Sequence, residues 1–351
     1  MRRTLALNAV IIALISMLAG CSGKSGEEKK HAESRAVVII SGGESTSPYT
    51  SPDQACATGL AAGHTDTAIR EYLLKKGHQV FTSPALAGRG QVVDQNGFGP
   101  FGVCPVILPE AMTVDSTGGI DTAGEHLARF LNYLHTDKGI DTVDLVGHSM
   151  GGLYARAAIR TIITTNLPIR VSSLITVGTP WQGTYMSDYV NGTIPLSDCL
   201  GDQLCEHSMQ NFKTELQHLV SGSAREVSQS YLMGKDGWNQ FQAGVLDKIP
   251  VTLIAGTKFT KTGQVNPLVW PNDGEVAVRS AFAVDIADSV LPHRRCVSFA
   301  DTHSIRLSDG LGLAWPTALT WDPAVFEALG TAIDSASKAL GGVNREGCPP
   351  A

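Results

Sequence analysis

The sequence has 351 residues, of which 43% are hydrophobic and 17% are charged. A chain of this length and composition can bury a sizeable core, which excludes a disordered protein. The net charge of −6 offers no basic surface of the kind that binds nucleic acid, so we expect no nucleic-acid partner.

Residues 1–20 have the pattern of a signal segment. Arg2 and Arg3 precede an apolar stretch that is too short for a membrane-spanning helix. The stretch ends in Leu18-Ala19-Gly20-Cys21, which resembles the lipobox of bacterial lipoproteins. That resemblance implies cleavage before Cys21 and an exported, cell-envelope lipoprotein held in the membrane by acyl chains on Cys21. The alternative is an ordinary secretory signal with an incidental cysteine, and a fully secreted protein.

Six of the seven cysteines remain when Cys21 is set aside, and an even number is typical of disulfides in an exported chain. Many pairings of six cysteines are possible, and unpaired thiols are the alternative. From proximity along the chain we favour Cys56–Cys104, Cys199–Cys205 and Cys296–Cys348. No cysteine or histidine spacing is typical of a metal site, and we expect neither a metal nor a cofactor.

Apolar strands and amphipathic helices alternate from residue 36 onward, after a polar tether over residues 21–35. We expect strands at 36–40, 79–81, 171–177 and 251–255, one that begins at Thr142, and a last one at 296–300. We expect helices at 65–76 and 323–340, and a third that starts with a capping box of Thr122 and Glu125 and ends at Gly139. Residues 84–115 have the composition of a loop. The alternation predicts one α/β domain over residues 36–345, built on a doubly wound, mostly parallel sheet.

The segment around Ser149 has the pattern of a strand, a sharp turn and a helix. Ser149 stands at the tip of the turn in Gly147-His148-Ser149-Met150-Gly151, a G-x-S-x-G motif. The flanking glycines let the strand and the helix approach each other closely. Because the motif occurs once and follows a buried type of strand, we interpret Ser149 as a nucleophile. The alternative is a tight turn without chemistry.

Four motifs together resemble those of the bacterial secreted lipases of the α/β-hydrolase family. They are Gly147-His148-Ser149-Met150-Gly151-Gly152, Gly178-Thr179-Pro180, Asn272-Asp273-Gly274 and a late His303. The resemblance implies the α/β-hydrolase fold, with an acid and then a histidine after the nucleophile. It also implies an oxyanion hole made by the backbone N–H groups of Gly43 and Met150. Ser41-Gly42-Gly43 departs from the His-Gly that the family commonly has in this loop.

Two histidines, His293 and His303, follow the strand at 251–255 and are candidates for the base. His303 comes just after the strand at 296–300, and therefore at the same rim as Ser149, whereas His293 lies at the amino end of that strand. We favour His303. For the acid we favour Asp273, because its neighbours form a turn that can aim the carboxylate inward. The alternatives are Asp285, Asp288, Asp301 and Glu275.

The alternation stops over residues 184–249. We interpret this segment as a cap inserted over the site, enclosing an apolar pocket for an acyl chain. The alternative is a purely structural insertion whose aromatic residues form small core clusters. These residues are Tyr185, Tyr189, Phe212, Tyr231, Trp238 and Phe241.

These features predict a serine carboxylic-ester hydrolase, a lipase or esterase that acts on acylglycerols or other fatty-acyl esters through an acyl-enzyme. A phospholipase, a thioesterase or an acyltransferase would use the same three side chains. The alternative from a different class is a surface lipoprotein that binds a partner and catalyses nothing.

Overall fold

A computed structural model of the protein describes residues 33–56, 66–93, 103–218, 223–336 and 342–350. The predicted signal segment, the lipidation site at Cys21 and most of the predicted tether lie outside the described residues. Within the described residues, no helix is both long and apolar enough to cross a bilayer.

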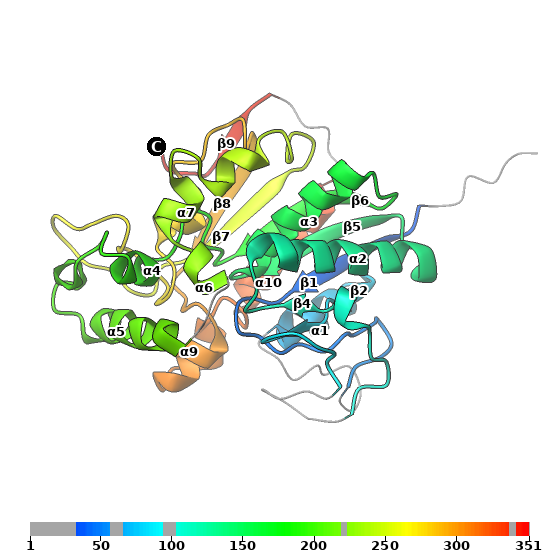
Figure 1. The fold of residues 1–351 in the computed structure, drawn as a ribbon, viewed down its shortest axis with the longest axis horizontal. Helices are drawn as coiled ribbons and strands as arrows, with labels where there is room; N and C mark the ends of the chain where they lie inside the picture. The colour runs from blue at the N-terminus through cyan, green and yellow to red at the C-terminus, as the bar shows by residue number, and fades with distance from the viewer. Residues whose placement is uncertain (1–32, 57–65, 94–102, 219–222, 337–341, 351) are drawn as a thin grey trace, which may run out of the picture. The chain divides into compact units, whose positions relative to one another are not determined.

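A parallel sheet forms the centre of the fold (Figure 1). Its seven strands within the described residues have the order β2-β1-β5-β6-β7-β8-β9. Their bounds are β1 Arg35–Ile40, β2 Val80–Thr82, β5 Thr142–His148, β6 Arg170–Val177, β7 Val251–Gly256, β8 His293–Phe299 and β9 Asn344–Glu346. Every neighbouring pair is parallel. The carboxyl ends of the strands therefore meet at one edge, where loops can bring distant residues together.

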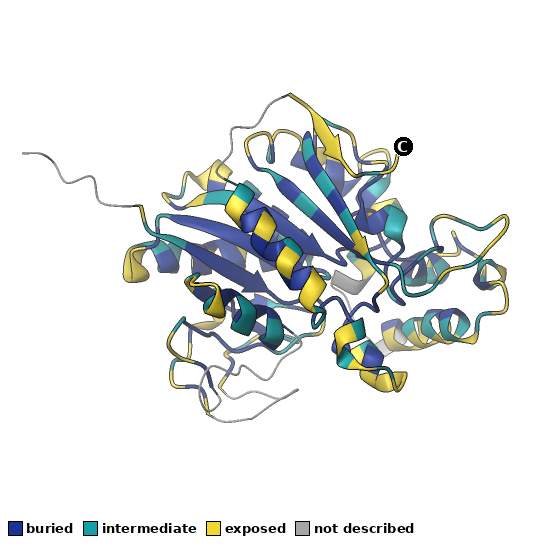
Figure 2. Ribbon diagram, turned by 180° about the vertical axis from the view of Figure 1, so that it is seen from behind, coloured by how far each residue is buried: buried dark blue, intermediate teal, exposed yellow. Residues whose placement is uncertain are grey.

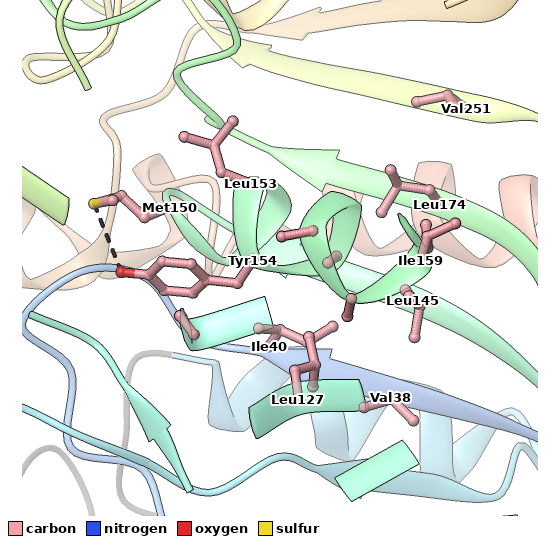
Figure 3. Close-up of a cluster of buried hydrophobic side chains, with 14 of the residues drawn as sticks. Val38, Ile40, Leu127, Leu145, Met150, Leu153, Tyr154, Ile159, Leu174 and Val251 are labelled. Atoms are coloured by element: carbon pink, nitrogen blue, oxygen red, sulfur yellow. Dashed lines mark hydrogen bonds between the residues drawn. The ribbon is translucent and has the colours of Figure 1, made fainter. Parts of the chain in front are cut away.

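Helices cover both faces of the sheet, which explains why its inner strands are apolar without alternation. Val38 and Ile40 pack on one face with α2 (Ile120–Lys138) and α3 (Gly151–Thr165). The alternate residues of β1 pack on the other face with α1 (Thr67–Lys75) and α10 (Pro323–Ser335). Figure 3 shows Leu127 of α2 beside Val38 and Ile40, and Figure 2 shows the inner strands buried.

The remaining elements are short. A second, two-stranded sheet pairs β3 (Ala85–Leu86) with β4 (Val114–Asp115) inside the segment predicted as a loop, which also holds η1 (Glu110–Met112). Between β6 and β7 lie α4 (Tyr185–Val190), η2 (Leu196–Cys199), α5 (Gln203–His218), α6 (Ser223–Glu226), α7 (Gln229–Met233) and η3 (Trp238–Gln242). After β7 come α8 (Val278–Ala281), α9 (Ile305–Gly310) and η4 (Trp315–Thr317).

Two local predictions were wrong. The helix predicted to begin with a capping box begins at Ile120, and its N-cap Gly119 makes no side-chain cap. The carboxylate of Glu226 accepts a hydrogen bond of 2.6 Å from the Ile120 N–H, so a distant acid satisfies the helix end. The strand at β8 is also not the last one, because the polar β9 pairs with its outer edge (Figure 2).

The structure contains the three favoured disulfides. Cys56 is bonded to Cys104, Cys199 to Cys205, and Cys296 to Cys348. The last of these joins β8 to the residues that follow β9, so the C-terminal segment is tied to the sheet.

Candidate active site

Ser149 lies in the sharp turn between β5 and α3, at the carboxyl edge of the sheet. Its φ of 53° is in the left-handed region, which a residue with a side chain rarely adopts. The turn is this tight because its neighbours lack side chains. A Cβ added at Gly147 would lie 2.5 Å from the Gly152 nitrogen, and one at Gly151 would collide with the carbonyl oxygen of Ile40. The turn thus holds Ser149 in a strained, half-buried position between the strand and the helix.

The loop after β1 lies directly against the serine. A Cβ added at Gly42 would lie 2.6 Å from the Ser149 Cβ. Both predicted oxyanion donors, Gly43 and Met150, line the same cavity as Ser149. The side chain of Met150 contacts the hydroxyl of Tyr154 (Figure 3). Within the described part of the chain, the backbone N–H groups of Gly43 and Met150 donate no hydrogen bond, so both are available to a substrate oxygen.

Ser41, at the start of the loop after β1, is a buried residue. Its hydroxyl donates a hydrogen bond of 2.8 Å to Asp66 Oδ2 and lies 2.7 Å from the Ser47 hydroxyl. The side chain therefore fixes the start of the loop rather than facing the cavity.

Asp273 and His303 form a buried pair on neighbouring loops. His303 Nδ1 donates to Asp273 Oδ2 over 2.8 Å, and the two residues are 2% and 0% exposed. The other carboxylate oxygen, Oδ1, accepts from the backbone N–H groups of Glu275 and Val276. The backbone N–H of His303 also donates to the Asp273 carbonyl. Four hydrogen bonds thus hold the acid and the imidazole in a single relative position.

The His303 ring also packs against His148. His148, which precedes Ser149, has its ring centroid 4.9 Å from that of His303. His148 Nε2 donates to the His303 carbonyl over 3.1 Å, and burial lowers the pKa of His148. Among the described residues, His303 Nε2 has no hydrogen-bond partner, so the bond to Ser149 is not made in this structure. Such bonds often tighten only when substrate is bound.

The carboxylates around His303 favour its protonated form. Burial lowers the pKa of His303, but the carboxylates of Asp273 and Glu275 outweigh burial and raise the pKa to about 9. Glu275 was predicted only as an alternative acid. The structure places its Oε2 3.5 Å from Nε2, on the side of the ring opposite Asp273.

The alternative candidates lie elsewhere. His293 begins β8, at the amino end of the sheet, and its Nε2 donates to a backbone carbonyl there. Asp285 and Asp288 form ion pairs with arginine side chains. Asp301 is buried, and burial together with Asp322 raises its pKa to about 7. None of these three acids bonds His303 Nδ1, whereas Asp273 does.

A cavity of about 430 Å³ opens at Ser149, between α5 of the cap segment and α9. Its wall is mixed rather than apolar as predicted. Apolar side chains include Met186, Leu204, Phe212, Val227, Leu307 and Leu311, and charged ones are Glu44, Glu215, Glu275 and Arg306. The charges gather where the cavity wall is in reach of solvent, because the carboxylates and the guanidinium need water.

Three of the six predicted aromatic residues, Tyr185, Tyr189 and Trp238, pack in core clusters, and Tyr231 and Phe241 are exposed. Phe212 is the one predicted aromatic that lines the cavity. The hydroxyl of Tyr185 donates to the Gly274 carbonyl over 2.6 Å, beneath the Asp273 loop. Trp238 and Trp181 both pack on the buried guanidinium of Arg156. The Arg156 Cζ atom lies 4.1 Å from the centroid of the Trp181 ring. For these side chains the structural interpretation holds.

The described residues contain no group of three or more His, Cys, Asp or Glu side chains that could hold a metal ion.

Comparisons with known proteins find similar sequences and structures. Residues 104–225 match the family model described as "Putative serine esterase (DUF676)". A triacylglycerol lipase of Pseudarthrobacter phenanthrenivorans is 32% identical over 79 residues, which is 22% of this chain and 23% of that protein. A triacylglycerol lipase of Burkholderia plantarii is also 32% identical over 79 residues, 22% of this chain and 21% of that protein. The matches thus span less than a quarter of these curated relatives.

Two solved structures are also similar. Bacillus licheniformis lipase BlEst2 in its propeptide form is 16% identical, with a TM-score of 0.48 over 90% of this chain and 53% of that one. Pyrococcus furiosus esterase Pf2001 is 12% identical, with a TM-score of 0.43 over 89% of this chain and 83% of that one. The parallel sheet, the serine turn after β5 and the loops after β7 and β8 that carry Asp273 and His303 are those of the α/β-hydrolase fold.

Proposed function

We propose that the protein is a serine hydrolase of carboxylic esters, a lipase or esterase that works through an acyl-enzyme on Ser149. The observation that carries this proposal is the buried hydrogen bond between Asp273 and His303 at the edge where a strained serine opens into a cavity. A serine hydroxyl is a weak nucleophile at neutral pH and needs a base held in a fixed orientation.

In this mechanism, His303 Nε2 accepts the hydroxyl proton as Ser149 Oγ attacks the ester carbonyl. The resulting oxyanion is stabilised by the N–H groups of Gly43 and Met150, and one such donor typically contributes about 10²–10³ in rate. The imidazolium gives its proton to the departing alcohol. Water then attacks the acyl-enzyme with His303 again as base, and the carboxylic acid leaves.

Asp273 acts through His303. By accepting the Nδ1 proton it selects the tautomer whose Nε2 is free to accept from serine. It also stabilises the imidazolium formed during attack. Its backbone donors leave it no other orientation.

Fatty-acyl esters, including acylglycerols, are the substrates we propose. An acyl chain suits the apolar part of the cavity wall, to which α4, α5 and α9 contribute Met186, Phe212 and Leu307. A phospholipase, a thioesterase or an acyltransferase would use the same three side chains. Rates on glycerides, phospholipids and thioesters of graded chain length separate these, because the cavity and not the Asp–His pair selects the substrate.

The test is the Ser149→Ala variant. It should lose hydrolysis of p-nitrophenyl esters and labelling by a fluorophosphonate probe while keeping its thermal unfolding transition. A folded Ser149→Ala protein that hydrolyses esters at the wild-type rate would refute the mechanism. Absence of labelling of the wild-type protein would favour a non-catalytic binding protein.

We also propose, from the sequence of residues 1–21, that the chain is exported and anchored by lipid on Cys21. Incorporation of labelled palmitate that is lost in a Cys21→Ala variant tests the anchor. Full secretion of the unmodified chain is the contrary result.

A further inference from the structure

We propose that Glu275 is a second carboxylate partner of His303 and sets the lower pH limit of the reaction by competing with Ser149 for Nε2. The inference rests on the proposed function, since it assigns His303 the role of base. It makes Glu275 a positioning residue, because its carboxylate acts on the substrate only through the imidazole.

The geometry places the His303 ring between two carboxylates. Asp273 Oδ2 accepts from Nδ1 at 2.8 Å, and Glu275 Oε2 lies 3.5 Å from Nε2. Nε2 is buried and without a hydrogen bond among the described residues. Glu275 lines the cavity that Ser149 opens into, and its side chain is 40% exposed. Among the described residues, the Glu275 side chain makes no hydrogen bond, and its one ion-pair contact is the one to His303.

The chemistry of this arrangement favours the doubly protonated ring. A carboxylate that faces Nε2 stabilises a proton on that nitrogen, and a protonated Nε2 cannot accept the hydroxyl proton of Ser149. When the proton leaves, the lone pair of Nε2 faces a negative charge and the contact with Glu275 becomes repulsive. The hydroxyl of Ser149 is then the better partner for Nε2.

Other charged groups near His303 do not share this position. Asp273 occupies Nδ1, and the ring of His148 at the end of β5 lies beside the His303 ring at an angle of 39°. Asp66 lies beyond His148, with Oδ1 3.6 Å from its Nδ1. Arg306 of α9 lines the cavity. Burial lowers the pKa of His303, and Asp273 followed by Glu275 is the main cause of its rise to about 9.

The experiment is the pH profile of kcat/KM on a neutral, short-chain p-nitrophenyl ester for the wild type and Glu275→Gln. The amide has the same shape but no charge, and the backbone N–H that bonds Asp273 is retained. We expect the acid limb to move down by about one pH unit, so that the rate on that limb rises about tenfold. Glu275→Asp, which keeps the charge, should shift the limb less.

Glu215→Gln is the matched control, because it removes a carboxylate from the same cavity on α5. It should move the acid limb much less than Glu275→Gln does. Equal shifts in both variants would mean that the cavity's charge as a whole acts on His303, and the specific role of Glu275 would be wrong. An acid limb that is unmoved or raised in Glu275→Gln also overturns the proposal.

A second measurement separates this proposal from the proposed function. In the Ser149→Ala protein, the His303 ring can be titrated by NMR with and without Glu275→Gln, and no turnover is needed. The titration midpoint should fall when the carboxylate is removed, and an unchanged midpoint contradicts the proposal even if the protein is a serine esterase. The proposed function is tested separately: it is wrong if the Ser149→Ala protein still hydrolyses esters.

Discussion

Replacing Gly42 by alanine should inactivate the enzyme without unfolding it. The new Cβ would lie 2.6 Å from the Ser149 Cβ and 3.2 Å from the His148 carbonyl oxygen. Carbon atoms in contact normally stand about 3.5–4.0 Å apart, so one of the two residues must move by about 1 Å. Ser149 cannot yield freely, because its N–H donates to the Val177 carbonyl at 2.8 Å and its turn is closed by glycines.

A displacement of about 1 Å at a reacting group can cost about 10²-fold in rate. We therefore expect kcat/KM for p-nitrophenyl esters to fall about 10²-fold in Gly42→Ala, with overpacking lowering stability by about 1–3 kcal/mol. Gly43→Ala is the matched control. Its Cβ would meet the Sδ of Met150 at 2.9 Å, at the end of a flexible side chain that can move aside.

The assay is kcat/KM together with thermal unfolding of both variants. The loss of activity should be much larger for Gly42→Ala than for Gly43→Ala, while both keep a cooperative transition. Wild-type activity in a folded Gly42→Ala protein would refute the reasoning, because the loop would then not touch the nucleophile as the structure has it.

Three further outcomes follow from the structure. Asp273→Asn should lower kcat by about 10³–10⁴, because the amide no longer selects the tautomer of the imidazole, and an intact circular dichroism spectrum shows whether the fold survives. Replacing Cys296 and Cys348 by serine opens a loop with a sequence separation of 52 and should lower the free energy of unfolding, measured with urea, by about 4 kcal/mol. An unchanged free energy of unfolding would mean that the two cysteines are not bonded. Asp301→Asn should raise stability above pH 7. Burial, followed by Asp322, raises the pKa of Asp301 to about 7, so the chain takes up a proton when it folds. The free energy of unfolding therefore falls as the pH rises from the pKa of Asp301 in the unfolded chain towards 7. The gain should be about 1–3 kcal/mol at pH 8 and vanish below pH 4, where both states are protonated.

The inner strands of the sheet can be predicted from the sequence, because strands that are buried on both faces consist of continuous apolar runs. Residues 36–40 and 171–177 fall on β1 and β6 for this reason. β9 has no such pattern, since Asn344–Glu346 is an exposed edge of polar residues held to β8 by backbone pairing. The start of α2 was also hidden, because its partner Glu226 lies 106 residues away.

The site was predictable as far as it depends on topology. Asp273 after β7 and His303 after β8 lie at the same edge of the sheet as the Ser149 turn because parallel strands end at one edge. The position of Glu275 depends on the turn between it and Asp273. Gly274 has a φ of 104°, and Asp273 Oδ1 accepts the Glu275 N–H. From the sequence, Asp273 and Glu275 were alternatives for the same role. In the fold they lie at different nitrogens of the His303 ring, Asp273 at Nδ1 and Glu275 near Nε2.

This separation has a consequence for how the activity can vary. Asp273 is buried and held by backbone donors, so any change there removes orientation and rate together. Glu275 is partly exposed, bonds nothing else through its side chain among the described residues, and touches the reaction only through Nε2. A single substitution at Glu275 can therefore move the pH range without dismantling the pair that makes the serine reactive. In the mechanism that we propose, the strength of the catalyst and its working pH are set by two acids only two positions apart, and the two properties can change independently.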